Sequence, residues 1–395
     1  MLLLDRAAAL RITPIWRLGF RPFFLAGALF AMVAIGLWSV ILAGLLPAWQ
    51  PPGGVLAWHR IEMPFGFGLA IVAGFLLTAV QTWTGRPGLS GRPLAGLFAL
   101  WCLGRLAWFV SMPLALLVVL QLGFAFALAG VLARQIFISR QKHNYPIPVV
   151  LGLIGLGQAL SLYGLAVQDV DLQRRGVLAA LWLIAALMGI IGGRVIPFFT
   201  QRGLGRTEPF TPRPWQNWLA LACTLLIAAS MAAGQGLVAR PIWAVLFLLV
   251  AGVQILQLVR WYDHGIWRVP LLWSLHIAFA WLIVAALGMA AWHLGLLEQQ
   301  SLVTHTLAVG AMGGLILAMI ARVTLGHTGR PLQPPRAISW AFAALHLGAA
   351  CRVLLAPFSS HALWLAAALW CLAFALFVKD YAPMLWRARV DGNPG

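Results

Sequence analysis

Four residues of the stretch AWHRIEMPFGFG, residues 57–68, carry groups that stand out in an apolar segment. His59, Glu62, Met63 and Gly66 follow one another at spacings of one, three or four, so a helix would place them close to one face. The imidazole of His59 could bind a metal or move a proton. The carboxylate of Glu62 could accept a hydrogen bond from His59 or pair with an arginine of another helix, and an interfacial ion pair with Arg60 is the structural alternative.

A second histidine, His305, opens a later apolar stretch much as His59 opens an earlier one. Both stretches are expected to cross in the same direction, so the two imidazoles would lie at similar depth. They could bracket a haem iron, and a buried pair of hydrogen-bonded histidines is the structural alternative. Arg105 and Arg352, expected near the same side, are suited to the haem propionates because arginine contacts carboxylates through two hydrogen bonds.

The other histidines fall into two groups. His276, His346 and His327 are expected nearer the opposite side, where they could hold copper, which accepts imidazole ligands. The remaining four lie in loops or at helix ends, where we expect solvated positions: His143, His264, His293 and His361.

The composition indicates which elements must position these residues. Of the 395 residues, 62% are hydrophobic and 9% are charged, and the mean hydropathy is +0.91, unlike a soluble domain. Apolar stretches long enough to cross a bilayer as helices, roughly 20 residues each, recur twelve times. They lie near residues 20–46, 58–83, 94–111, 114–138, 146–167, 175–199, 214–234, 240–261, 269–292, 301–325, 336–356 and 361–384. We expect an all-α polytopic membrane protein with one transmembrane domain over residues 1–395.

The formal net charge of +18 indicates how the protein is oriented in the membrane and does not indicate nucleic-acid binding. Nineteen of the 27 lysines and arginines fall on the side of the N-terminus, four fall on the other side, and four lie within the apolar stretches. Positive residues accumulate on the cytoplasmic side of membrane proteins. We therefore expect both termini in the cytoplasm.

A short repeat suggests an internal organisation. Thr84-Gly85-Arg86-Pro87 recurs as Thr328-Gly329-Arg330-Pro331, after the second and the tenth apolar stretch. A weaker likeness joins residues 193–200 to residues 321–328. These echoes predict three four-helix repeats, near residues 20–138, 146–261 and 269–384, with chance similarity of apolar helices as the alternative.

Several of these stretches together resemble the NnrS family of bacterial inner-membrane proteins, which are reported to carry haem and copper and are associated with the response to nitric oxide. They are WHRIEMPFGFG…AGFLLTAVQTWTGRP (58–87), GGRVIPFFT (192–200), PLLWSLH (270–276), HTLAVGAMGG…ARVTLGHTGRP (305–331) and RVDGNPG (389–395). The resemblance implies haem b and copper as cofactors. The positions of this sequence that match the family's pattern include His59, Glu62, Met63, Gly66, His276, His305, Arg322 and His327.

Two comparisons limit that implication. Where the family often has a second histidine, this chain has Ile61, so no metal site can rely on that position. The arrangement of twelve helices is also similar to the catalytic subunit of haem-copper oxidases and nitric oxide reductases, at the level of the fold. Those enzymes place further metal ligands on helices 6 and 7, which contain no histidine here, so we do not expect a copied binuclear centre.

Three functions follow as hypotheses. The first is a haem protein that binds or converts nitric oxide, with Glu62 as proton donor or as the group that orients His59, and with a quinol or a cytochrome as electron donor. Turnover, as in a reductase, and simple binding both stay open. The second is a transporter of a metal, haem or a small ion that uses intramembrane histidine and glutamate. The third is a sensor or assembly factor that holds haem.

Overall fold

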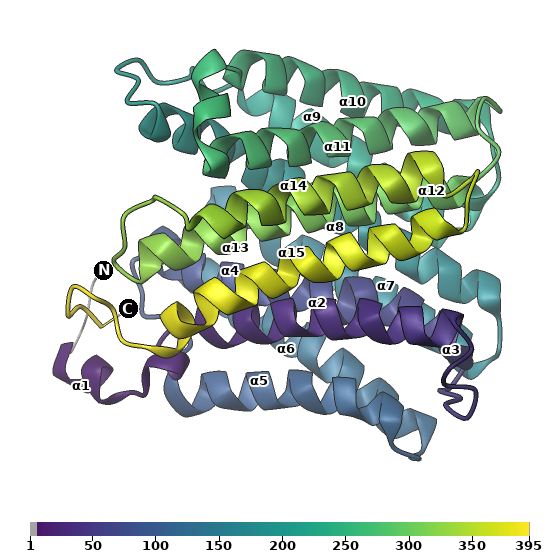
Figure 1. Cartoon of the computed structure of the whole chain (residues 1–395), viewed down its shortest axis with the longest axis horizontal. Coiled ribbons are helices and arrows are strands. Elements are labelled where there is room, and N and C mark those ends of the chain that lie inside the picture. Colours follow the sequence, from purple (N-terminus) through teal and green to yellow (C-terminus); the bar gives the residue numbers. More distant parts are fainter. Residues whose placement is uncertain (1–5, 395) are drawn as a thin grey trace. The chain divides into compact units, whose positions relative to one another are not determined.

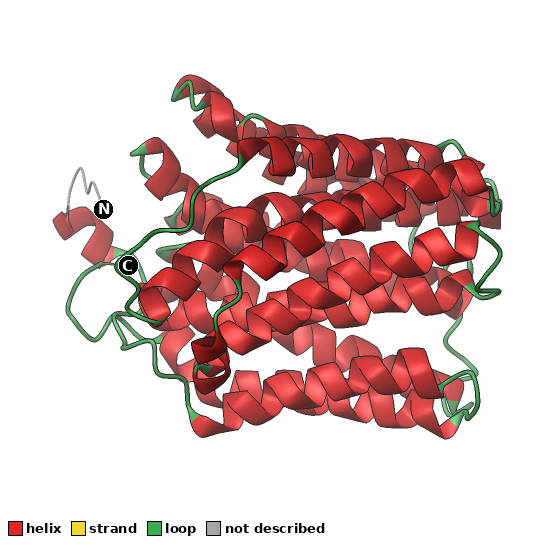
Figure 2. Cartoon of the chain, turned by 90° about the horizontal axis from the view of Figure 1, so that it is seen from above, coloured by secondary structure: helices red, strands yellow, loops and turns green. Residues whose placement is uncertain are grey.

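The computed structural model describes residues 6–394, and every regular element in this range is a helix (Figures 1 and 2). Eleven of the described helices are long and apolar enough to cross a membrane. The expected span near residues 94–111 is shorter: α5 (Gly91–Leu106) has 16 residues and continues into a 3-10 turn at Ala107–Phe109. The prediction of an all-α polytopic membrane protein is confirmed.

The chain forms two compact units, each built from separate parts of the sequence. Unit 1 comprises Met1–Val177, Ile320–Ile338 and Phe374–Gly395, and unit 2 comprises Leu178–Met319 and Ser339–Ala373. These bounds differ from those of the three predicted repeats, which stay a prediction.

Most helices belong to one unit. Unit 1 contains α1 (Arg6–Arg11), α2 (Phe20–Leu42), α3 (Gly54–Ile61), α4 (Leu69–Thr84), α5, α6 (Leu114–Ile138) and α7 (Pro146–Ala166). Unit 2 contains α9 (Pro214–Ala232), α10 (Pro241–Trp261), α11 (Pro270–His293) and α12 (Gln300–His305). Four helices begin in one unit and end in the other: α8 (Val170–Gly203), α13 (Gly314–His327), α14 (Arg336–Ala350) and α15 (His361–Trp386).

Three helices widen into π-helical turns. The first π turn (Glu62–Gly68) joins α3 to α4, the second (Thr306–Gly313) joins α12 to α13, and the third (Cys351–Leu355) extends α14. In the first, Leu69 donates its N–H to the carbonyl of Pro64, five residues earlier. Such turns are rare in proteins overall, and those that occur often lie at functional sites. Two of them begin just after the histidines singled out in the sequence, His59 and His305.

The repeated Thr-Gly-Arg-Pro motif ends two helices in the same way. The hydroxyls of Thr84 and Thr328 each donate to the carbonyl four residues earlier, at 2.7 Å. Gly85 and Gly329 follow with φ of 65° and 74°, the left-handed conformation that ends helices and favours glycine. The repeat therefore has a local structural meaning, and it supports the equivalence of the second and tenth spans.

Some helical glycines allow close packing of neighbouring helices. A Cβ atom on Gly74 of α4 would lie 2.8 Å from two ring atoms of Phe24 and 3.0 Å from the Cβ of Phe23, both on α2. Both phenylalanines are fully buried, so neither can move aside easily. At Gly36 of α2, by contrast, a Cβ would meet nothing within 4 Å.

We expect Gly74→Ala and Gly36→Ala to change stability in opposite directions. Overpacking at Gly74 should destabilise the protein by roughly 1–3 kcal/mol. At Gly36 the alanine should stabilise by roughly 0.5–1 kcal/mol, because it restricts the unfolded chain without a clash. Thermal unfolding of the two variants in detergent measures both effects. Equal melting temperatures would contradict the close approach of α2 and α4.

Candidate functional site

Glu62, the first residue of the first π turn, lies in a fully buried ion pair in unit 1. Its Oε2 lies 2.5 Å from the Nε of Arg105, near the end of α5. Its Oε1 accepts hydrogen bonds from the indole N–H of Trp108 at 2.5 Å and from the amide of Gln121 at 2.8 Å. Arg105 supplies a counter-charge and the other two partners donate hydrogen bonds, so all three favour the charged form of the carboxyl group. Of the alternatives left open by the sequence, an arginine from another helix is the partner.

Gln121, on α6, connects this ion pair to a third helix. Its carbonyl oxygen accepts from Arg105 and from Gln158 of α7, the latter at 3.2 Å. Its amide nitrogen donates to Glu62 and to the carbonyl of Gly104, at 2.8 and 3.0 Å. The side chain thus uses both donors and both acceptor positions. Sequence reasoning missed Gln121, Trp108 and Gln158, although a glutamine within an apolar helix was a usable signal.

Gly66 provides the space for the ion pair. A Cβ at this position would collide with Oε2 of Glu62 and would lie 3.2 Å from Cδ of Arg105. The carbonyl of Gly66 accepts a hydrogen bond from the indole of Trp101 at 2.9 Å. The space beside Gly66 is therefore filled by protein side chains. Met63, next to Glu62, is half-buried.

His59 lies one turn before Glu62, at the end of α3, and is half-buried. Its ring stacks on the indole of Trp38 from α2, with centroids 4.3 Å apart and planes 19° apart. This stacking fixes the plane of the imidazole.

His305, in unit 2, ends α12 directly before the second π turn. Its Nδ1 lies 2.7 Å from the carbonyl of Ser301, which can only accept, so Nδ1 carries the hydrogen and Nε2 keeps its lone pair. Nη2 of Arg352, in the third π turn, lies 3.2 Å from Nδ1 and 3.3 Å from Nε2, so it is beside the ring and not on one nitrogen. The imidazole is therefore a neutral base with a cation beside it.

The two units repeat one local arrangement. In each, a π turn follows a histidine by three residues or fewer, and an arginine from the next helix along the chain returns to the start of that turn. The arginine meets Glu62 in unit 1 and His305 in unit 2. Both expected arginines, Arg105 and Arg352, thus contact residues singled out in the sequence.

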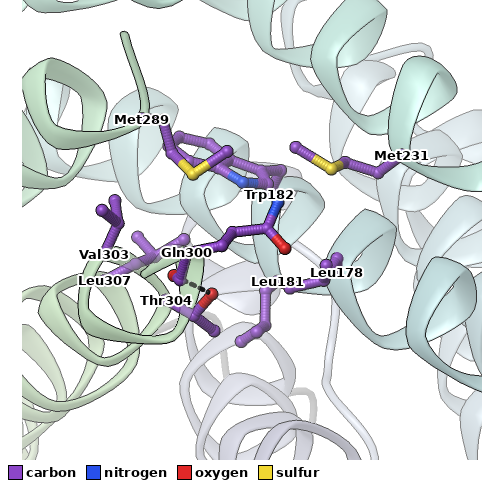
Figure 3. A pocket seen from close by; sticks show the side chains of 9 residues that line it. All are labelled: Leu178, Leu181, Trp182, Met231, Met289, Gln300, Val303, Thr304 and Leu307. Atoms are coloured by element: carbon purple, nitrogen blue, oxygen red, sulfur yellow. Dashed lines mark hydrogen bonds between the residues drawn. The ribbon is translucent and has the colours of Figure 1, made fainter. Parts of the chain in front are cut away.

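The cavity nearest in sequence to His305 lies in unit 2 and is mostly apolar (Figure 3). The hydroxyl of Thr304 and the side-chain amide of Gln300 face this space, and both make hydrogen bonds to backbone carbonyls, at 3.1 and 3.2 Å. Its lining comprises Leu178, Leu181, Trp182, Met231, Met289, Gln300, Val303, Thr304 and Leu307.

The other histidines have separate surroundings. In unit 2, His276 is buried on α11 with Nδ1 2.9 Å from the carbonyl of Leu272, and His346 is half-buried beside Trp273. In unit 1, the ring of His327 lies 5.6 Å from that of Phe20. Among residues 6–394, no three histidine, cysteine or acidic residues gather closely enough to hold a metal ion.

His293 and Arg322 are both buried, the first against expectation. His293 is 1% exposed, and its Nδ1 accepts the backbone N–H of Arg240 at 3.2 Å. The prediction of a solvated position was wrong because a helix end can pack beneath a neighbouring loop. Arg322, on α13, is 5% exposed.

The fold and the buried polar network define a polytopic helical membrane protein. Residues 14–389 match the NnrS protein family, and the chain belongs to that family. The resemblance noted in the sequence is thereby confirmed over nearly the whole chain. No curated protein matches it significantly. Membership supports a role linked to the response to nitric oxide.

Removing either partner of the buried pair should be far more harmful than removing both. Glu62→Gln and Arg105→Met should each destabilise by about 3–5 kcal/mol, because each leaves a buried charge uncompensated. The double variant should recover most of this loss in unfolding experiments in detergent.

The ion pair of Arg206 with Asp263 provides a control, since its side chains are 36% and 31% exposed. Asp263→Asn should cost no more than about 1 kcal/mol. A Glu62→Gln variant as stable as the parent protein would contradict the importance of the buried pair.

Proposed function

We propose that the chain is a haem-binding membrane protein that binds or converts nitric oxide, with His305 and His59 as the predicted haem ligands. The observation that carries the proposal is the state of His305. The bond from its Nδ1 to the carbonyl of Ser301 fixes the tautomer and makes Nε2 more basic, as in metal-bound histidines. The imidazole of His305 would therefore be suited to hold haem iron.

When bound, haem iron would supply the position that takes nitric oxide. The protein would supply orientation and charge. Trp38 holds the ring plane of His59, and Ser301 holds that of His305. Arg352 is half-buried and bonds only the imidazole in the described structure, so it is the arginine better suited to a propionate. Arg105 is already engaged by Glu62 and Gln121.

The cavity shown in Figure 3 supports the proposal that the ligand is small and uncharged. Apolar cavities tend to stay free of water and admit apolar molecules of matching size. Thr304, which lines the cavity, is the neighbour of His305 in the chain. Nitric oxide dissolves in lipid, so it could reach such a space without a polar channel.

Glu62 is proposed as a fixed negative charge. Its Oε1 accepts two hydrogen bonds and its Oε2 faces the guanidinium of Arg105, so a proton on either oxygen would have to displace a donor or lie against a positive charge. This favours a role in holding the start of the π turn. Copper as a second cofactor, an electron donor such as a quinol or cytochrome, and an inner-membrane location with cytoplasmic termini complete the proposal.

A second candidate function is transport of a metal, haem or a small ion. The observation in its favour is the buried pair of Glu62 and Arg105 with its glutamine extension, since ionisable groups within a membrane often mark a substrate or proton path. Transport needs no bound chromophore, so a spectrum separates the two functions.

We expect the purified protein, prepared from haem-supplied cells, to show a Soret band that shifts when nitric oxide is added to the reduced form. His305→Ala should lose or change this band. His346→Ala, which removes a half-buried histidine of the same unit, should leave it unchanged. An unaltered spectrum of the His305→Ala variant would contradict the ligand assignment, and a protein without any Soret band would favour transport.

A further inference from the structure

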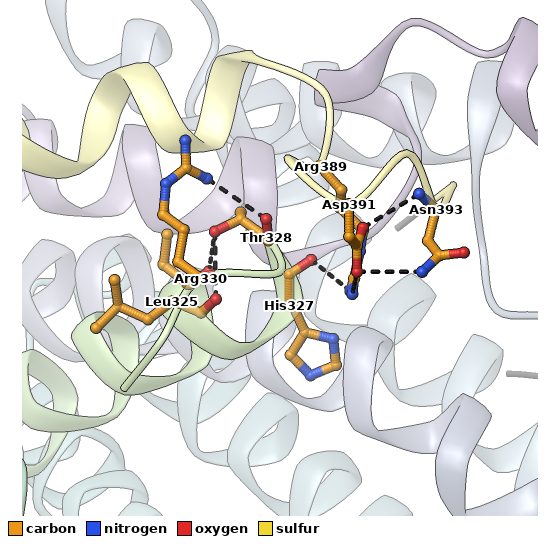
Figure 4. Close-up of polar contacts among 8 residues, drawn as sticks. Leu325, His327, Thr328, Arg330, Arg389, Asp391 and Asn393 are labelled. Atoms are coloured by element: carbon orange, nitrogen blue, oxygen red, sulfur yellow. Dashed lines mark hydrogen bonds and ion pairs between the residues drawn. The ribbon is translucent and has the colours of Figure 1, made fainter. Parts of the chain in front are cut away.

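The C-terminal segment of the chain is fixed to the end of α13 in unit 1 (Figure 4). The N–H of Val390 donates to the carbonyl of Thr328 at 3.3 Å, and Arg389 donates to the carbonyl of His327 at 3.0 Å. Asp391 lies against Gly329, where a Cβ would be 2.9 Å from its carboxyl carbon. This contact brings the residues after α15 beside the second Thr-Gly-Arg-Pro motif.

Four arginines meet around this contact, and we call them the arginine cluster: Arg17, Arg21, Arg330 and Arg389. Arg21, in the first turn of α2, is fully buried, and like Arg17 it contacts carbonyls of the C-terminal residues 385–394. Arg389 and Arg330 bond the neighbouring carbonyls of His327 and Thr328. Asp391 balances one of these charges through two bonds to Arg389, at 2.9 and 2.6 Å. These bonds hold the pKa of Asp391 well below its usual range, so it stays charged. The cluster keeps an excess of positive charge.

Two members of the cluster are locked by the protein, and two have donors to spare. Arg17 donates to the carbonyls of residues 10, 12 and 394, and Arg389 donates to Asp391 and His327. Arg21 donates through Nη1 to the carbonyls of residues 385 and 387. Its Nε and Nη2 are buried with no hydrogen-bond partner among the described residues. Arg330 makes a long hydrogen bond, 3.5 Å, to the carbonyl of Thr328.

We propose that the arginine cluster binds a phosphate group, either of an anionic phospholipid headgroup or of free phosphate. Several acceptor oxygens and a negative charge match the spare donors of Arg21 and Arg330 and offset the crowded positive charge. The cluster also lies where headgroups lie. Helix α2 begins at Phe20, α13 ends at His327 and α15 ends at Trp386, so the arginines are at the ends of membrane-spanning helices. Basic pockets at such ends bind acidic lipids.

The test uses the full-length protein, stripped of lipid in an uncharged detergent. Its melting temperature is followed against phosphatidylglycerol, phosphatidylcholine and inorganic phosphate, and bound lipid is counted by native mass spectrometry. We expect phosphatidylglycerol to stabilise the protein and phosphatidylcholine to have little effect. Stabilisation by phosphatidylglycerol alone identifies a lipid as the source of the phosphate group, and equal stabilisation by inorganic phosphate identifies the free ion.

Arg330→Gln should weaken the apparent affinity for phosphatidylglycerol about tenfold, the effect of losing one strong ionic hydrogen bond. Arg86→Gln is the matched control, because Arg86 holds the same place in the first copy of the motif. It should bind as the parent protein does. Arg330→Lys, which keeps the charge, should be intermediate and guards against a folding defect. Equal affinities of the Arg330→Gln and Arg86→Gln variants, or no preference for either phosphate-bearing anion over phosphatidylcholine, would overturn the proposal.

Discussion

A charge within the hydrocarbon region of a membrane needs its counter-charge and its hydrogen bonds from the protein, because lipid provides neither. Glu62 meets this requirement with one ion pair and two hydrogen-bond donors. The donors come from the end of α5, from the turn that follows it and from α6, so these elements must keep their register relative to the first π turn. Gly66 is part of the same constraint, since a larger residue would occupy the place of the carboxylate.

The same logic gives unit 2 a different outcome. There the arginine of the following helix meets an imidazole and not a carboxylate, so Arg352 keeps a full positive charge beside a neutral base. The guanidinium of Arg352 has no counter-charge, so its contact with the imidazole adds little to stability. The same two groups suit a cofactor that carries carboxylates and a metal centre. The charge of Arg105 is neutralised by Glu62, whereas the charge of Arg352 is not neutralised by His305. The proposed ligand site therefore centres on unit 2.

Hydropathy located the helices well. The span expected at residues 114–138 is α6 (Leu114–Ile138), and most other bounds agree within a few residues. The charge pattern also singled out Glu62 and Arg105 as residues that lipid would not tolerate. Their pairing could not be chosen in advance, because it depends on which faces of separate helices meet. The π turns escaped detection since a local widening leaves composition unchanged, and the burial of His293 depends on a loop that hydropathy treats as solvent.

Gln121 has a mechanical consequence. Its four hydrogen bonds connect α6 with α5, α7 and the first π turn, and rotating its amide by half a turn would oppose donor to donor and acceptor to acceptor. The group therefore acts as a rigid coupling. A displacement of α7 that draws Gln158 away alters the polarisation of the amide and, through it, the electric field at the carboxylate. A movement of α7 would therefore change the electric field at Glu62.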